Sequence, residues 1–232
     1  MPSSTQLPTS SSLLVLYGGT FDPVHHGHLA IAGAARDLLQ ATIRLMPAAD
    51  PPHRAPPGAS ADQRAEMLDL ALAGEPGLCV DRRELHRDGR SYSIDTLLEL
   101  RAQIGDDAPV ALLVGADSFV GLPDWHRWHE LFDHAHFVVA ERPGSPLDHD
   151  LRPELAAALE GRWRTAPAAL REAPSGRVLR LRQPLHAESA TSIRARIAAG
   201  EPWRDQVPAA VAAYIQRHGL YLNGDGIRGP AT

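Results

Sequence analysis

Side chains and backbone groups suited to binding phosphate gather in one short stretch near the amino end. Residues 18–28 are Gly-Gly-Thr-Phe-Asp-Pro-Val-His-His-Gly-His, and they follow an apolar run that ends at Tyr17. Glycines let a backbone approach an anion closely, and free N–H groups at a helix start point toward it. His25 and His28 are three residues apart, so on a helix both imidazoles can converge on one ligand. The stretch predicts a strand, a turn and a helix start that bind nucleotide phosphate.

This stretch matches neither of the common glycine-rich phosphate loops. It contains no lysine of the P-loop type and no Gly-x-Gly-x-x-Gly fingerprint of dinucleotide-binding domains. A zinc site, a solvated surface and a plain tight turn are the alternatives for its isolated parts. Zinc would need a third ligand at suitable spacing, which is not apparent, and Cys79 is the only cysteine. The complete stretch favours phosphate binding.

Residues 18–28 resemble the signature of nucleotidyltransferases that use a histidine motif in place of a P-loop. Within that group they are most similar to the bacterial nicotinate-nucleotide adenylyltransferase family, and the resemblance runs from about Leu14 to Tyr221. Further matching segments follow in the same order: Pro-Pro-His-Arg at 51–54, Ser-Tyr-Ser at 91–93, Gly-Ala-Asp-Ser at 115–118, Trp125, Arg-Pro-Gly at 142–144 and Ser-Ala-Thr-Ser-Ile-Arg at 189–194.

The resemblance implies an enzyme that joins nicotinate mononucleotide to the AMP part of ATP and releases pyrophosphate. It implies that His25, His28 and Arg194 are catalytic. It also implies a set of ATP-binding residues: Gly18, Gly19, Thr20, Phe21, Gly27, Ser189, Thr191 and Ile193. Mg²⁺ is expected to arrive with ATP, because no cluster of carboxylates resembles a metal cage built by the protein. Another adenylyl- or cytidylyltransferase, of the phosphopantetheine type, and a non-catalytic nucleotide sensor stay open as alternatives.

The segment 189–194 can supply the second half of a phosphate site. Ser189 and Thr191 precede a predicted helix that carries Ile193, so their hydroxyls and the first N–H groups can face an anion together. Arg194, on the first turn, can fork across phosphate oxygens. An ordinary helix cap and a solvated arginine are the alternatives.

The chain departs from the family pattern just before this segment. Glu188 stands where a β-branched apolar residue is usual, and Leu185 and His186 stand where some members carry aromatic residues. A carboxylate near triphosphate is repulsive, so we expect Glu188 to turn outward or to serve another group.

Residues in the middle of the chain could recognise nicotinate mononucleotide. Asp117, after a predicted strand, can accept hydrogen bonds from ribose hydroxyls, although it could also cap a helix. Trp125 can stack on the pyridine ring, whereas Trp128 is expected in the core. Tyr92 and Ser93 can present N–H groups to the nicotinate carboxylate, which would favour the acid over the amide. The resemblance adds further residues to this site: Arg54, Ala116 and Arg142.

Alternating apolar runs and helical patterns predict an α/β fold: a Rossmann-like open parallel sheet with helices on both faces and a small C-terminal helical part. The helix signals include a capping box at Ser60, a cap at Ser93 and a last helix between Pro208 and Gly219. We expect one domain over 13–222, with tails at 1–12 and 223–232 and a surface insertion over about 141–176. The predicted strands are Leu13–Tyr17, Thr42–Met46, Leu78–Asp81, Val110–Val114 and His136–Ala140.

Composition limits the environment and the partners. One cysteine, no apolar run that could span a bilayer and no signal peptide predict a soluble cytoplasmic protein with no membrane partner. A formal net charge of −5 argues against a nucleic-acid partner, and it means that local positive groups must hold anionic substrates. We expect a monomer or a small homo-oligomer that binds ATP and nicotinate mononucleotide.

Overall fold

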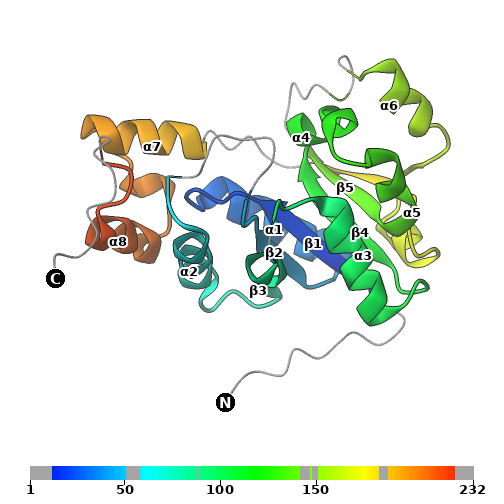
Figure 1. The fold of residues 1–232 in the computed structure, drawn as a ribbon, viewed down its shortest axis with the longest axis horizontal. Helices are drawn as coiled ribbons and strands as arrows, with labels where there is room; N and C mark the ends of the chain where they lie inside the picture. The colour runs from blue at the N-terminus through cyan, green and yellow to red at the C-terminus, as the bar shows by residue number, and fades with distance from the viewer. Residues whose placement is uncertain are drawn as a thin grey trace.

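The computed structural model contains a seven-stranded sheet with helices on both faces (Figure 1). It describes residues 12–50, 58–87, 89–141, 147, 151–182 and 188–222, so the predicted tails lie outside it apart from Ser12. The strands are β1 Leu14–Gly19, β2 Ile43–Pro47, β3 Leu78–Val80, β4 Val110–Gly115, β5 His136–Glu141, β6 Trp163–Arg164 and β7 Val178–Arg182. The helices are α1 His26–Leu39, α2 Ala61–Leu72, α3 Ser93–Ile104, α4 Ala116–Val120, α5 Leu131–His134, α6 Pro153–Ala158, α7 Ala190–Ala199 and α8 Ala209–His218.

The strand order is β3-β2-β1-β4-β5-β7-β6, and every neighbouring pair is parallel. Chain order runs outward from β1 through β2 to β3 on one side and from β4 to β5 on the other, so the topology switches between β1 and β4. In open α/β sheets, ligands bind outside the carboxyl ends of the strands at such a point. The expected fold class is confirmed, and it places the ends of β1 and β4 at the natural binding edge.

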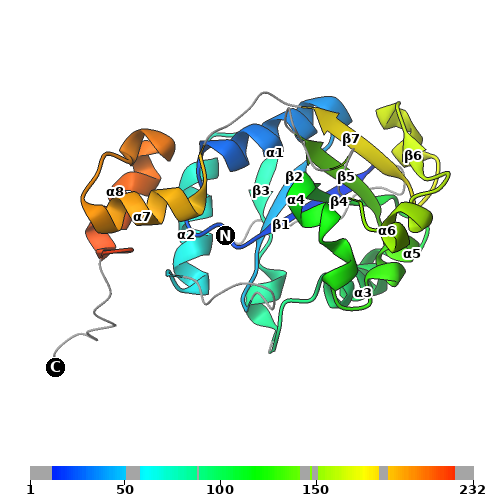
Figure 2. The ribbon, with the colours of Figure 1, turned by 90° about the horizontal axis from the view of Figure 1, so that it is seen from above.

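Both faces of the sheet are buried, because side chains alternate along each strand. In β1, Val15 and Tyr17 belong to a core shared with α1, α2, α7 and α8. Leu14 and Leu16 belong to a second core with α3, α4, α5 and α6. Figure 2 shows α1 on one side of the sheet and α3 and α5 on the other. Strands such as β1 and β4 are therefore apolar along their whole length because both faces of the sheet are buried.

The five predicted strands are present, with ends shifted by one or two residues, but β6 and β7 escaped prediction. Arginines at positions 180 and 182 interrupt the apolar pattern of β7, and β6 has only two residues. The interpretation of 141–176 as a surface insertion was wrong for much of the segment. It contributes α6 and β6, and its leucines Leu155, Leu159 and Leu170 are buried.

Most helix ends follow their local signals. Ser60 and Gln63 form the predicted capping box on α2, and α8 lies between Pro208 and Gly219 as expected. Ser93 is not a cap, because Tyr92 occupies the N-cap position and Ser93 is the first residue of α3. Helices α7 and α8 lie beside α2 at one end of the molecule (Figure 1). No helix in the described part of the chain is long and apolar enough to cross a membrane.

Arg101 is a buried structural cation that links the end of α3 to the neighbouring turns. Its guanidinium donates to five main-chain carbonyls: those of Gly105, Asp106, Ala108, His134 and Pro174, at 2.6–3.2 Å. Burial lowers the pKa of this guanidinium, and the carboxylates of Asp106 and Asp107 oppose that shift.

Arg101→Met should lower the free energy of unfolding by about 3 kcal/mol, because the buried guanidinium that links five main-chain carbonyls of three segments is lost. Arg82→Met is the matched control, since Arg82 pairs with Asp69 at the surface and its side chain is 38% exposed. The control should cost less than about 1 kcal/mol. Urea unfolding of both variants measures the difference, and equal losses would contradict the structural role of Arg101.

Candidate active site

A cavity of about 570 Å³ opens at the switch point between β1 and β4. This volume suits a small-molecule site. Gly18 and Gly19, from the end of β1, and Gly115, from the end of β4, form part of its wall. The structure brings together there most of the residues predicted for nicotinate mononucleotide and three predicted for ATP: Tyr92, Ser93, Asp117 and Trp125, with Gly18, Gly19 and Thr20.

The two motif histidines lie against each other at the start of α1. His25 is the N-cap, with extended backbone, and His28 lies in the first turn. Their rings stack with centroids 3.7 Å apart, and the His25 N–H donates to Nδ1 of His28 at 3.3 Å. Gly27 is buried in the same turn. The predicted convergence of the imidazoles on one face is therefore present, next to the N–H groups of the helix start.

In the turn before the histidines, the ring of Phe21 packs closely against Gly19. Phe21 has a φ of 50°, an unfavourable value for a bulky residue, and its ring is buried. A Cβ on Gly19 would lie 2.9 Å from that ring. The ring in turn meets the His28 ring edge-on, with centroids 5.0 Å apart. Phe21 therefore supports the site as a packed core residue.

The segment 189–194 meets the histidine turn directly. Ser189 is the N-cap of α7, and its Oγ accepts from the Ser192 N–H at 3.1 Å. Thr191 lies within the first turn, so the expectation that it precedes the helix was wrong. Ile193 is fully buried, so only its backbone could face a ligand. Arg194 donates from a terminal nitrogen to the carbonyl oxygen of Asp22 at 2.7 Å.

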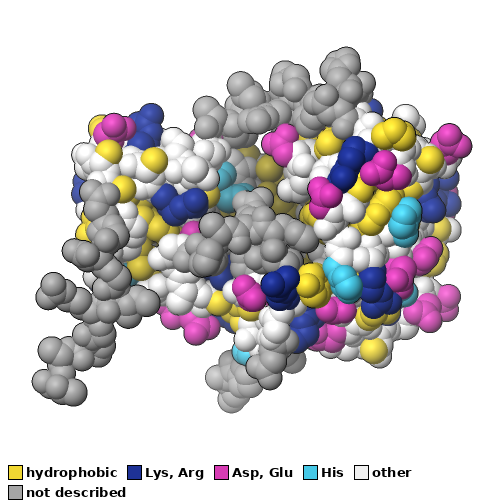
Figure 3. Space-filling model, turned by 45° about the horizontal axis from the view of Figure 1, so that its top comes forward, with side chains coloured by type: hydrophobic (Ala, Val, Ile, Leu, Met, Phe, Trp, Pro, Cys, Tyr) yellow, Lys and Arg dark blue, Asp and Glu magenta, His cyan; other side chains and the backbone are white. Residues whose placement is uncertain are grey.

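Figure 3 shows a hollow between the end that carries α7 and α8 and the rest of the molecule, with histidine side chains visible inside it. The two phosphate-binding segments predicted from the sequence are therefore adjacent in space, and neither is on the far side of the molecule.

One part of the cavity wall, where the sequence predicts the pyridine ring, is built from the starts of two helices and a tryptophan. Asp117 is the second residue of α4, whose N-cap is Gly115, so it does not cap that helix. Ala116 is buried as its first residue. Trp125 is partly buried against the core that contains Trp128, which confirms the core position of Trp128.

Two buried charged residues of the site carry no recognisable local signal in the sequence. Glu84 lines the cavity and is 5% exposed; the Thr96 hydroxyl donates to its carboxylate at 2.7 Å. Burial raises the pKa of Glu84, and hydrogen bonds from Thr96 and Ser91 oppose the shift. Arg64 is 1% exposed and donates to the carbonyl of Thr20 at 2.8 Å. The partners Thr96 and Thr20 are 12 and 44 residues away in sequence, which is why spacing did not reveal these contacts.

Some predicted residues cannot be placed. Arg54, Arg142, Leu185 and His186 lie outside the described residues. Glu188 is partly buried and its Oε2 is shielded from solvent, so its carboxylate does not turn fully outward as one expectation had it. Within the described residues, no three His, Cys, Asp or Glu side chains cluster in a way that could hold a metal ion.

Gly19→Ala should lower the free energy of unfolding by about 1–3 kcal/mol, because the new methyl group would displace the buried ring of Phe21. Gly33→Ala, on α1, is the matched control. A Cβ there meets nothing within 4 Å, and alanine should stabilise the helix by about 0.5–1 kcal/mol. Urea unfolding measures both changes, and an unchanged stability of the Gly19 variant would contradict the close approach.

Comparison with known proteins identifies relatives over nearly the whole chain. A protein of Stenotrophomonas maltophilia named as a probable nicotinate-nucleotide adenylyltransferase is 61% identical over 215 residues, which cover 90% of this chain and 97% of the relative. A Xylella fastidiosa protein with the same name is 48% identical and covers 90% and 96% of the two chains.

Solved structures share the fold. Plasmodium falciparum nicotinic acid mononucleotide adenylyltransferase complexed with NaAD aligns with a TM-score of 0.68 at 14% identity, over 90% of this chain and 97% of that one. The cytidylyltransferase-like family model matches residues 16–196, which span the histidine turn, the switch-point cavity and Arg194. The chain therefore belongs to the cytidylyltransferase-like family and, within it, to the nicotinate-nucleotide adenylyltransferases.

Proposed function

We propose that this chain transfers the adenylyl group of ATP to nicotinate mononucleotide, giving nicotinate adenine dinucleotide and pyrophosphate. The observation that carries the proposal is the hydrogen bond from Arg194 to Asp22, which places the C-terminal cation beside the histidine turn. One triphosphate can then meet the imidazoles, the α1 N–H groups and the guanidinium together. The bacterial relatives, which carry this activity in their names, support the same assignment.

The reaction needs alignment more than proton transfer. The 5′-phosphate of nicotinate mononucleotide is already an anion at neutral pH, so it can attack the α-phosphorus of ATP without a general base. The bond to the β-phosphate oxygen breaks, and pyrophosphate leaves with that electron pair. Catalysis then consists of holding two polyanions in line and offsetting the developing charge. His25, His28, Arg194 and the first N–H groups of α1 are the groups we assign to this task.

The other substrate fits the remaining wall of the cavity. Tyr92 and Ser93 lie at the start of α3, where N–H groups without helical partners suit the nicotinate carboxylate. Trp125 offers a flat face for the pyridine ring. Asp117, at the start of α4, can accept from ribose hydroxyls. This arrangement orients the 5′-phosphate toward the end of β1.

We assign the divalent metal to the substrate. The groups assigned to the triphosphate are imidazole, guanidinium and backbone N–H, which suit anions and not Mg²⁺, and the nearby carboxylate of Asp22 is occupied by hydrogen bonds within the protein. Mg²⁺ would enter bound to ATP, where it supplies charge neutralisation between phosphate oxygens. The chain contributes the donors around it. We also propose a cytoplasmic location, with a small homo-oligomer or a monomer as the working form.

His28→Ala should lower turnover by about 100-fold or more, because a donor to the developing phosphate charge is lost. His129→Ala is the control, since its exposed ring stacks on Trp128 away from the cavity lining. Pyrophosphate release from ATP and nicotinate mononucleotide measures both, with melting curves to confirm folding. Near-normal turnover of a folded His28 variant would refute its role.

The wild-type protein should prefer nicotinate mononucleotide to nicotinamide mononucleotide by about 10-fold or more in kcat/KM, because only the acid places a carboxylate at the start of α3. The same pyrophosphate assay, run with each mononucleotide and with phosphopantetheine, separates the alternatives. Turnover of phosphopantetheine alone would favour the related transferase, and no turnover with any acceptor would favour a nucleotide sensor.

A further inference from the structure

One buried carboxylate joins three segments of the chain at the phosphate end of the site. Asp22, in the histidine turn, is 4% exposed. Its Oδ2 accepts from the Gly58 N–H at 2.8 Å, and its Oδ1 accepts from the Ala59 N–H at 3.1 Å. Oδ1 also accepts from the Tyr221 hydroxyl at 2.7 Å. The turn is thereby attached both to the entry of α2 and to the residues that follow α8.

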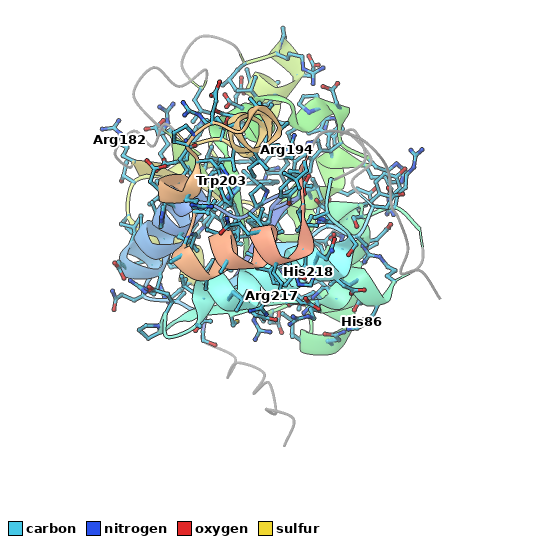
Figure 4. The ribbon with its side chains drawn as sticks, turned by 90° about the vertical axis from the view of Figure 1, so that its left-hand side faces the viewer. His86, Arg182, Arg194, Trp203, Arg217 and His218 are labelled. Carbon is cyan, nitrogen blue, oxygen red and sulfur yellow. The ribbon has the colours of Figure 1, made fainter. Side chains whose placement is uncertain are left out.

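Arg194 completes this group. Its guanidinium donates to the carbonyl of Asp22 at 2.7 Å and lies 3.8 Å from the Asp22 carboxylate. The Arg194 side chain as a whole is 35% exposed. Figure 4 views the molecule from the end that carries α7 and α8 and labels Arg194 beside α7. Asp22 thus holds one terminal nitrogen of Arg194, and the other terminal nitrogen donates to the Thr191 hydroxyl at 3.4 Å.

Tyr221 is held in a demanding position. Its φ is 64°, a backbone region that costs a bulky residue energy unless its surroundings fix it. Its ring lies so close to Gly58 that a Cβ there would be 2.8 Å from a ring carbon and 3.7 Å from Cδ of Arg194. Burial raises the pKa of Tyr221 far above its usual range, so the hydroxyl remains a donor to Asp22.

We propose that Asp22 and Tyr221 are positioning residues that fix Arg194 in register with the histidine pair for the ATP triphosphate. The inference rests on the proposed function and adds to it a role for the chain beyond α8. Hydrogen bonds and an ion pair compensate the charge of Asp22, which would otherwise repel the triphosphate. Without the Tyr221 hydroxyl, the carboxylate can turn toward Arg194 and draw it away from the ligand.

Tyr221→Phe tests this role, with Tyr214→Phe as a matched control. Each tyrosine hydroxyl donates to a carboxylate and ties the C-terminal part to the rest of the chain, but Tyr214 bonds to Glu66 on α2, away from the histidine turn. Tyr221→Phe should raise both the KM and the calorimetric Kd for Mg-ATP by about 10-fold, the size expected for one hydrogen bond to a charged group. The KM for nicotinate mononucleotide should stay within about 2-fold of the wild type.

Tyr214→Phe should leave both constants unchanged, although both variants should melt at lower temperature. Gly58→Ala provides a second route, because its methyl group displaces the Tyr221 ring without removing a hydroxyl, and it should weaken ATP binding in the same way. Equal ATP affinities of the two phenylalanine variants would overturn the proposal. A loss of affinity for both substrates in Tyr221→Phe would overturn it too. The measured ATP affinity tests the positioning role independently of turnover. A wild-type protein without activity would contradict only the proposed reaction.

Discussion

The structure depends on a contact between residues that are 172 positions apart: the hydrogen bond from Arg194 to the carbonyl of Asp22. It joins the two elements that we propose bind phosphate, each of which is weak alone. A helix start with two histidines offers N–H groups and imidazoles, and α7 offers a guanidinium. Only in register can they surround one triphosphate. The fold keeps the start of α1 and α7 in this relative position.

The order of the strands in the sheet positions the elements of the site. The strand sequence switches between β1 and β4, so two glycine-ended strands open next to each other and leave room for a ligand. The residues assigned to the two substrates then lie on the same edge of the sheet. A chain with a formal net charge of −5 gains nothing from its overall field for anionic substrates. Local hydrogen-bond donors at helix starts and two or three cationic groups must attract the anionic substrates instead.

Sequence reasoning recovered the features that are local and missed those that are not. Apolar runs predicted five strands, and glycine and serine signals predicted several helix ends, because these depend on near neighbours. Strand β7 escaped because Arg180 and Arg182 serve a partner, Glu141, on the adjacent strand. The roles of Asp22 and Glu84 escaped for the same reason. Their partners are set by tertiary contacts, which no spacing in one sequence records.

These buried polar groups also explain how loops can form a precise site. Arg64 donates to Thr20 and Ala49, and the Ala49 N–H in turn donates to the hydroxyl of Ser91. The turns after β1 and β2 and the segment before α3 are thus linked by hydrogen bonds beneath the cavity. Apolar side chains could fill the same volume, but their contacts are not directional and would allow several positions of the turns. Hydrogen bonds specify one arrangement. Directional bonds under the loops therefore fix the cavity wall, which in the proposed reaction would align the two substrates.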